Sequence, residues 1–172
     1  MPRVLWTSRK FNFDFPHELY PEMLERLYGT PLRLENLLKS INSSQLTQKQ
    51  GERWSIQENA GHFIQVEPLW ISRIDDILSG DEVMRAADMS NKRTYEADYN
   101  EMKIGDIVGE FHDVRRKFTD RLRELSEDDF ARSAIHPRLN KPMRIIDLCY
   151  FAAEHDDFHL ATIRELDHYF GY

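Results

Sequence analysis

Three histidines are the residues whose type and spacing best fit chemistry in this chain. His155 and His159 stand four residues apart in an otherwise apolar segment, so in a helix both side chains leave the same face. Two close imidazoles cannot both take a charge cheaply in a core of low dielectric constant. A shared divalent metal ion resolves that conflict, because it binds the neutral ring. With His62 as a third ligand and one open position, the set would match a catalytic metal site.

Carboxylates near these histidines are candidates for supporting roles. Glu58 lies one helical turn before His62, where it could ligate the metal or orient a nucleophile as a catalytic residue. It also completes a capping box with Ser55, which is the simpler role. Asp156 or Asp157 could accept the second N–H of a metal-bound imidazole. For any one buried histidine, an ordinary hydrogen-bonded core residue is the alternative to a metal ligand.

Two further residues stand out by their position. His136 lies in a loop directly before the last predicted helix, and this loop could fold over the mouth of a bundle beside a substrate. We therefore name His136 as a second catalytic candidate. Glu67 falls on an apolar stripe, about 140° around the helix axis from His62, so we expect it not to contact the metal. A buried partner, such as an arginine, is expected for its carboxylate. The remaining histidines have no spacing partner and are assigned to the surface or to packing: His17, His112 and His168.

Four long segments have the periodicity of amphipathic helices, at about residues 21–41, 55–79, 104–125 and 142–170. Gly29 and Pro31 predict a kink or break in the first segment, and Pro68 predicts a kink in the second. The Ser79–Gly80 pair should end the second helix. No stretch alternates for long enough to predict a strand. The fold expected is all-α, a four-helix bundle in a single domain of residues 1–172.

The segments between the helices also carry predictions. Residues 1–15 form an irregular aromatic arm, which we expect to pack across an end of the bundle. Residues 81–103 are polar and long enough to cross between parallel neighbouring helices, with room for a short helical piece. Residues 126–141 are expected to be a loop.

Composition excludes some classes of function. The chain has 172 residues, a formal net charge of −7 and a pI near 5.5, which makes it a poor general binder of nucleic acid or of anionic membrane. A local basic run is flanked by acids, so we expect a solvated helix face there: Arg115, Arg116, Lys117, Arg121 and Arg123. The single cysteine, Cys149, lies in an apolar stretch and is expected to be buried and inert. No signal peptide or membrane span is visible, and cytoplasmic location is the expectation.

Three stretches of this sequence together resemble one known family. They are WSIQENAGHFIQVEPLW around His62, HPRLNKPMRIIDLCYFAAEHDDFHLATI near the C-terminal end, and RKFNFDFP…LERLYGTPLRLENLL near the start. The most specific parts are the Trp-Ser-x-x-Glu…Gly-His segment and the His-Asp-Asp-x-His segment. Over nearly the whole chain, the sequence resembles the DinB-like (DinB/YfiT) superfamily.

The resemblance implies a bundle of up-down-down-up topology that is often a homodimer. It also implies a divalent metal, variously Zn, Ni or Fe, on His62, His155 and His159. Many members carry another histidine where this chain has Phe158, a departure that leaves the three ligands in place.

Two functions of different classes remain open at this point. Characterised members of the family include thiol-dependent S-transferases, a thiol-dependent isomerase and metal-dependent hydrolases. The first hypothesis is therefore an enzyme whose metal activates a thiol or water to attack a small-molecule electrophile, with a low-molecular-weight thiol as a candidate cosubstrate. The second is a non-catalytic, metal-stabilised interaction module related to stress. An open coordination position beside a pocket would favour the enzyme.

Overall fold

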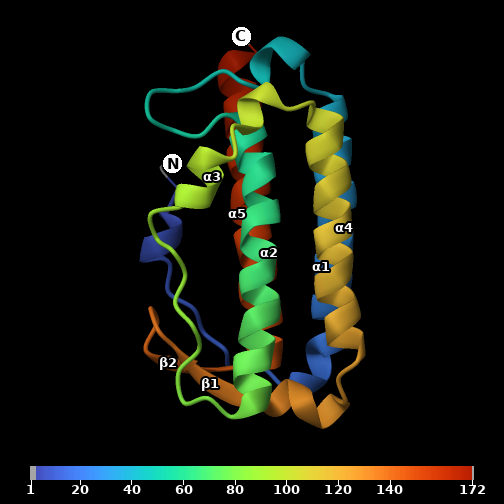
Figure 1. Cartoon of the computed structure of the whole chain (residues 1–172), viewed down its shortest axis with the longest axis vertical. Coiled ribbons are helices and arrows are strands. Elements are labelled where there is room, and N and C mark those ends of the chain that lie inside the picture. The colour runs from blue at the N-terminus through green and yellow to red at the C-terminus, as the bar shows by residue number, and fades with distance from the viewer. Residues whose placement is uncertain (1–2, 172) are drawn as a thin grey trace.

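Four long helices form the molecule, as predicted. In this computed structural model, which describes residues 3–171, they are α1 (Tyr20–Lys39), α2 (Ile56–Ser79), α4 (Ile104–Arg123) and α5 (Ile145–Phe170). The first two residues of the predicted arm, and the final residue, lie outside the described part. In Figure 1, α1 and α5 run upward, whereas α2 and α4 run downward. Each of α1 and α2 packs against both α4 and α5, which gives the up-down-down-up bundle.

The crossover between the parallel helices α2 and α4 is the long connection expected at 81–103. It contains a short helix, α3 (Lys92–Glu96), and a 3-10 turn over Tyr99–Glu101. Figure 1 shows this connection running back along the outside of α2 before α4 begins. The connection therefore covers one face of the bundle.

Local sequence signals set both ends of α2. Ser55 Oγ accepts a hydrogen bond from the Glu58 amide at 3.0 Å, and Glu58 Oε2 accepts one from the Ser55 amide at 2.8 Å. This is the predicted capping box. At the other end, Gly80 adopts a left-handed conformation, with φ of 81°, and closes the helix.

The prolines inside the helices do not interrupt them. Of the predicted kink or break near Thr30, the break is absent, because α1 is continuous from Tyr20 to Lys39. Pro31 has no N–H to give the Leu27 carbonyl four residues earlier. Arg115 Nη1 donates to that carbonyl at 3.0 Å, so the lost bond is replaced from another helix. The helix α2 likewise continues through Pro68.

A small hairpin precedes the last helix, where sequence analysis expected a loop and an earlier helix start. Strands β1 (Ser133–His136) and β2 (Lys141–Arg144) pair antiparallel, with Ala134 opposite Met143. Pro142 therefore lies in β2, and α5 begins only at Ile145. Four-residue strands are too short to give a recognisable alternation, which is why the periodicity missed them.

The N-terminal arm lies along α5 and not across an end of the bundle, which corrects the prediction. Arg3 donates to the Phe158 carbonyl at 2.7 Å, and Arg9 donates to the Glu154 carboxylate at 3.2 Å. Trp6 packs on Phe151, with ring centroids 4.9 Å apart. The arm thus covers part of α5.

An ionic network at the centre of the bundle joins all four long helices. Arg115 of α4 donates to Glu67 of α2 and, at 2.6 and 3.0 Å, to Asp156 of α5. Asp156 also accepts from Thr30 of α1 at 2.7 Å. The buried arginine partner expected for Glu67 is thus confirmed. The prediction that Arg115 lies on a solvated face is wrong, because its side chain is 2% exposed.

The helices contain a buried cysteine and no segment suited to cross a membrane among the described residues. Cys149 is buried in α5, as predicted, and burial raises the pKa of its thiol, so that it stays protonated. Within residues 3–171, no helix has both the length and the apolar character that crossing a membrane requires.

Candidate metal centre

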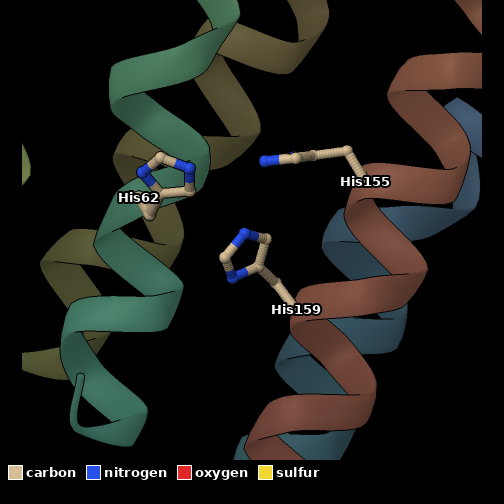
Figure 2. A group of neighbouring side chains, drawn as sticks. All are labelled: His62, His155 and His159. Carbon is tan, nitrogen blue, oxygen red and sulfur yellow. The ribbon is translucent and has the colours of Figure 1, made fainter. Parts of the chain in front are cut away.

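The three predicted ligands converge from two facing helices. His62 comes from the second turn of α2, and His155 and His159 come from adjacent turns of α5 (Figure 2). The ring centroids are 4.6–5.2 Å apart, and each ring offers a nitrogen within 4.8 Å of one in each other ring. The cluster predicted from the spacing is therefore present.

The tautomer of His159 follows from its neighbour Asn59. The Asn59 amide group donates from Nδ2 to the backbone carbonyls of Trp54 and Ser55, at 3.3 and 2.8 Å. Its Oδ1 is consequently the atom that faces His159 Nδ1, at 2.9 Å, and Nδ1 must carry the proton. The other ring nitrogen, Nε2, keeps its lone pair and is free to bind a metal.

The crossover connection holds His62 in the same manner. Thr94 of α3 lies 3.0 Å from His62 Nδ1 through its hydroxyl oxygen. The connection can approach this closely because residue 61 is glycine. A Cβ at Gly61 would come within 2.3 Å of the Tyr99 ring. The Gly-His pair in the sequence therefore serves the packing of the connection as well as the site.

Burial keeps all three rings neutral. Their exposed fractions are 8% for His62, 4% for His155 and 6% for His159. Loss of hydration lowers the pKa of His62 to about 4, and it lowers the pKa values of His155 and His159 well below the ordinary value. Neutral imidazoles are the protonation state in which histidine binds a metal.

His155 gives the clearest sign that a ligand belongs here. Its ring packs edge-on against Trp6 and Trp70, at centroid distances of 5.1 and 5.7 Å. Its Nδ1 is buried and has no hydrogen-bond partner among the described residues. Buried polar atoms are rarely left unpaired in native proteins. Three neutral imidazoles with one such nitrogen fit a divalent metal ion, and the donor set matches that of catalytic zinc-type sites.

The three histidines form part of the wall of a cavity of about 1320 Å³. Six parts of the chain line it: the arm, residues 52–54, α2, residues 85–95 with part of α3, the hairpin and α5. Trp6 of the arm and Phe151 of α5 supply aromatic wall near the histidines. A molecule in this cavity could reach the open side of the candidate metal.

The other predicted residues lie in different surroundings. His136 is buried in β1 and lines the cavity, so it faces the same space as the histidine cluster. Glu58 is not part of the cavity wall; its carboxylate caps α2 and pairs with Lys49 at 2.8 Å. The catalytic roles of both stay predictions.

The carboxylates next to His155 do not hold the imidazoles. Asp156 is bound to Arg115 and Thr30, and Asp157 is bound to Arg26 and Arg33. The partners of the rings are instead Asn59 and Thr94, and Trp6 covers the site. Sequence reasoning missed these three residues. Only Asn59 carried a signal, since it stands three residues before His62 in the same helix.

Comparison with known proteins agrees with this description. Residues 26–163 match the DinB superfamily. A search of curated proteins gives no match. Among solved structures, YfiT from Bacillus subtilis, described as "a probable metal-dependent hydrolase with an unusual four-helix bundle topology", has a TM-score of 0.80 at 18% identity, covering 95% of this chain and 94% of that one.

A second structure, the mycothiol-dependent maleylpyruvate isomerase, has a TM-score of 0.66 at 12% identity. The match covers 86% of this chain and 60% of that one, so the isomerase has further sequence outside the shared bundle. At these identities the structural matches establish the shared fold. With the family match over most of its length, the chain belongs to the DinB superfamily.

Proposed function

We propose that this protein is a metal-dependent enzyme of the thiol S-transferase or hydrolase type, acting on a small electrophile. His62, His155 and His159 would hold a divalent metal ion, with Zn, Ni and Fe as candidates. Such an ion lowers the pKa of a bound thiol or water and supplies a nucleophile near neutral pH. The observation that carries the proposal is that three neutral, buried imidazoles line a cavity large enough for a small molecule.

The described relatives support both branches of the proposal. YfiT is described as a probable metal-dependent hydrolase, and the isomerase is dependent on mycothiol, a thiol. A low-molecular-weight thiol is therefore a reasonable cosubstrate to test for this chain. Homodimer formation and cytoplasmic location stay predictions from the sequence and the family resemblance.

The residues around the cluster would position the ligands and exclude water. Asn59 fixes His159 through the 2.9 Å contact, and Thr94 holds His62 at 3.0 Å. Orienting contacts of this kind raise metal affinity, because the rings need not be ordered when the metal binds. Trp6 and Trp70 pack against His155 and leave little room for bulk water on that side.

His136 and Glu58 enter the proposal in different ways. We propose that His136 acts on the substrate side, since it lines the cavity. Glu58 would act indirectly, because its contacts set the start of α2 and hence the place of His62 one turn later.

Metal content and turnover test the proposal together. The protein should be purified without a histidine tag and analysed for bound metals. It should then be loaded separately with Zn, Ni and Fe. Each form should be assayed against electrophiles with several cellular thiols, and against ester and amide substrates. We expect turnover that His155→Ala abolishes.

A matched control is His112→Ala, because His112 lies on α4 at 3.6 Å from Glu35, away from the cavity wall. It should keep both metal and turnover. If every metal-loaded form is inactive on both panels, and a cobalt-substituted form shows no exchangeable ligand by spectroscopy, the interaction-module hypothesis is the better one.

A further inference from the structure

Unpaired polar atoms gather at the cavity that holds the histidine cluster. Among the described residues, five buried side-chain atoms have no hydrogen-bond partner, and four of them belong to cavity-lining residues. Besides His155, these are the indole N–H groups of Trp54 and Trp70 and the Nη2 of Arg138. Indole and guanidinium nitrogens only donate hydrogen bonds. The cavity wall therefore contains buried N–H groups that lack an acceptor.

Arg73, on α2, adds a buried positive charge that no described carboxylate contacts directly, although Asp76 attracts it from a greater distance. Its side chain is 1% exposed, and its contacts are the Arg85 carbonyl at 3.2 Å and the His136 ring at 3.1 Å. No described carboxylate lies within 4.0 Å of its guanidinium; the near candidate, Asp76, is bound to Arg85. A buried arginine ordinarily has an anionic partner.

His136 adds another N–H group that has no acceptor. Its Nδ1 accepts hydrogen bonds from the backbone N–H groups of Arg138 and Leu139, both at 3.2 Å. A neutral imidazole has one acceptor nitrogen, so the proton is on Nε2. Nε2 is the atom that faces Arg73 Nη1 at 3.1 Å. Two hydrogen-bond donors therefore face each other without an acceptor between them. An acceptor atom beside them would receive both.

The rest of the surroundings does not supply that acceptor. Arg138 donates through Nη1 to the Thr7 carbonyl, and its charge repels that of Arg73. Burial lowers the pKa of Arg73 to about 10, so the guanidinium is still charged at neutral pH. Two of the three acidic residues of the cavity wall have partners of their own: Glu165 pairs with Arg3 and Arg53, and Asp88 accepts from Ser90. The third, Glu52, lies two residues before Trp54, whose ring packs against His62 at the other end of the cavity. The Arg73 end of the cavity thus remains positive.

We propose that Arg73 and Arg138, with the N–H groups of His136 and Trp70, form a subsite for a carboxylate group of the substrate or cosubstrate. A planar carboxylate has two acceptor oxygens, which suits guanidinium groups better than a single point acceptor would. This inference rests on the proposed function, because it assigns the other end of the same molecule to the metal.

The fold also sets the shape of that molecule. His62 and Arg73 are eleven residues apart on one helix, which corresponds to ~16 Å along its axis. Aromatic rings lie between the two ends: Trp70 contacts both His155 and the Arg73 guanidinium, and Phe151 contacts His136. The ligand class is therefore an elongated carboxylic acid with an apolar middle, whose thiol or electrophile is remote from the acid.

The acid subsite can be tested without metal. Octanoate and octanamide have the same length and differ in the anionic group, and their binding to the metal-free protein can be followed by tryptophan fluorescence and calorimetry. We expect octanoate to bind at least about tenfold more tightly, as a charge-assisted hydrogen bond would give. Arg73→Met should remove this preference and leave octanamide binding unchanged. Arg138→Met, at a half-buried position, is the second variant in case the first does not fold.

The matched control is Arg93→Met, which removes the same charge from an exposed residue of the cavity wall. It should keep the preference for the acid. Equal binding of octanoate and octanamide by the wild type would overturn the subsite, as would an equal loss in all three variants.

A second pair of probes separates this proposal from the proposed function. 8-Mercaptooctanoate and its amide carry a thiol at the far end and should bind more tightly to the zinc-loaded protein than to the metal-free protein. If zinc has no effect on either probe while the acid preference persists, the metal role fails and the subsite stands. If zinc strengthens both probes equally and the acid has no advantage, the subsite fails and the metal role stands.

Discussion

Arg115 and Arg73 are both buried arginines, but their partners differ and the pKa values of the two side chains shift in opposite directions. Arg115, in the bundle centre, is bound by two carboxylates, and their attraction raises its pKa in spite of burial. Arg73, at the cavity wall, has a carbonyl and an imidazole beside it, and burial lowers its pKa to about 10. Arg115 stabilises the fold through ion pairs, whereas Arg73 forms no direct ion pair and is available to the carboxylate proposed above.

The contrast also explains how the bundle keeps its shape beside a large cavity. The Arg115 network ties α1, α2, α4 and α5 together directly behind His155, through Asp156. The helices that carry the histidines are thereby fixed relative to each other. Among the described residues, one acceptor of this network, Glu67 Oε2, has no donor, whereas the unpaired buried atoms of cavity-lining residues are all nitrogens.

The largest effect should come from breaking the central network. Arg115→Met leaves Glu67 and Asp156 buried without their cation, and we expect a loss of ~3–5 kcal/mol in the free energy of unfolding, measured by urea denaturation. Arg73→Met removes a charge that forms no direct ion pair, and its effect should stay within ~1 kcal/mol or be stabilising. Similar losses in the two variants would mean that the two arginines do not differ in the way described.

Neutralising the carboxylates that bind Arg115 tests whether the loss of stability comes from unpaired charge. Burial raises the pKa of Glu67 to about 7, against the attraction of Arg115. Adding Glu67→Gln and Asp156→Asn to Arg115→Met should recover much of the lost stability, because no unpaired charge is then left in the core. Without such recovery, the loss would have to come from packing and not from charge.

The second effect in size should come from the metal. An ion that binds only the folded state stabilises it by ~2.7 kcal/mol when the free ion is a hundredfold above its dissociation constant. We expect a chelator to lower the melting temperature of the wild type, because this stabilisation is then lost. The melting temperature of His159→Ala should not change. Arg73→Met should respond like the wild type. A wild type that melts at one temperature with and without chelator contradicts the metal's structural role.

A separate effect, measured as a slope, is a pH dependence on the cavity side. Burial, with the nearby charges of Arg73 and Arg138, lowers the pKa of His136 to about 3. Between pH 3 and the unfolded value of about 6.5, the unfolded chain binds a proton that the folded protein does not. The contribution of His136 to stability is therefore complete above pH 6.5 and is lost as the pH falls.

This pH effect can be isolated by substitution. His136→Gln should reduce the slope of stability against pH in that interval by up to ~1.4 kcal/mol per unit. Both proteins should be measured in chelator, so that the histidine cluster contributes equally to each. Parallel pH profiles would contradict the burial of a neutral His136.

The sequence predicted the parts of this molecule that depend on local patterns. Helical periodicity predicted the four long helices, Ser55 and Glu58 predicted the start of α2, and the spacing of His155 and His159 predicted two members of the histidine cluster. Parts that depend on contacts between distant segments were missed. Arg115 was read with its charged neighbours, although it shares a stripe with Phe111 and Phe118, and only the Leu27 and Asp156 contacts give it a buried role.

The same reason explains the other omissions. Thr94 reaches His62 only because the crossover connection folds back along α2, and the path of that connection has no periodic signal. The donors at the Arg73 end come from α2 and from the β1–β2 hairpin, which are far apart in the sequence, so no spacing rule could assemble them.

The smallest effect should be seen at His136 in catalysis. Its ring lies at the Arg73 end of the cavity, so His136→Ala should leave the metal content unchanged by elemental analysis. Removing its Nε2–H deletes one donor from the acid subsite, and we expect KM for an acidic substrate to rise by roughly tenfold while turnover of its amide changes little. The distinction matters for the comparison of the two arginines. If His136→Ala instead releases the metal, the two ends of the cavity are coupled, and the donors around Arg73 serve the histidine cluster and not a separate ligand group.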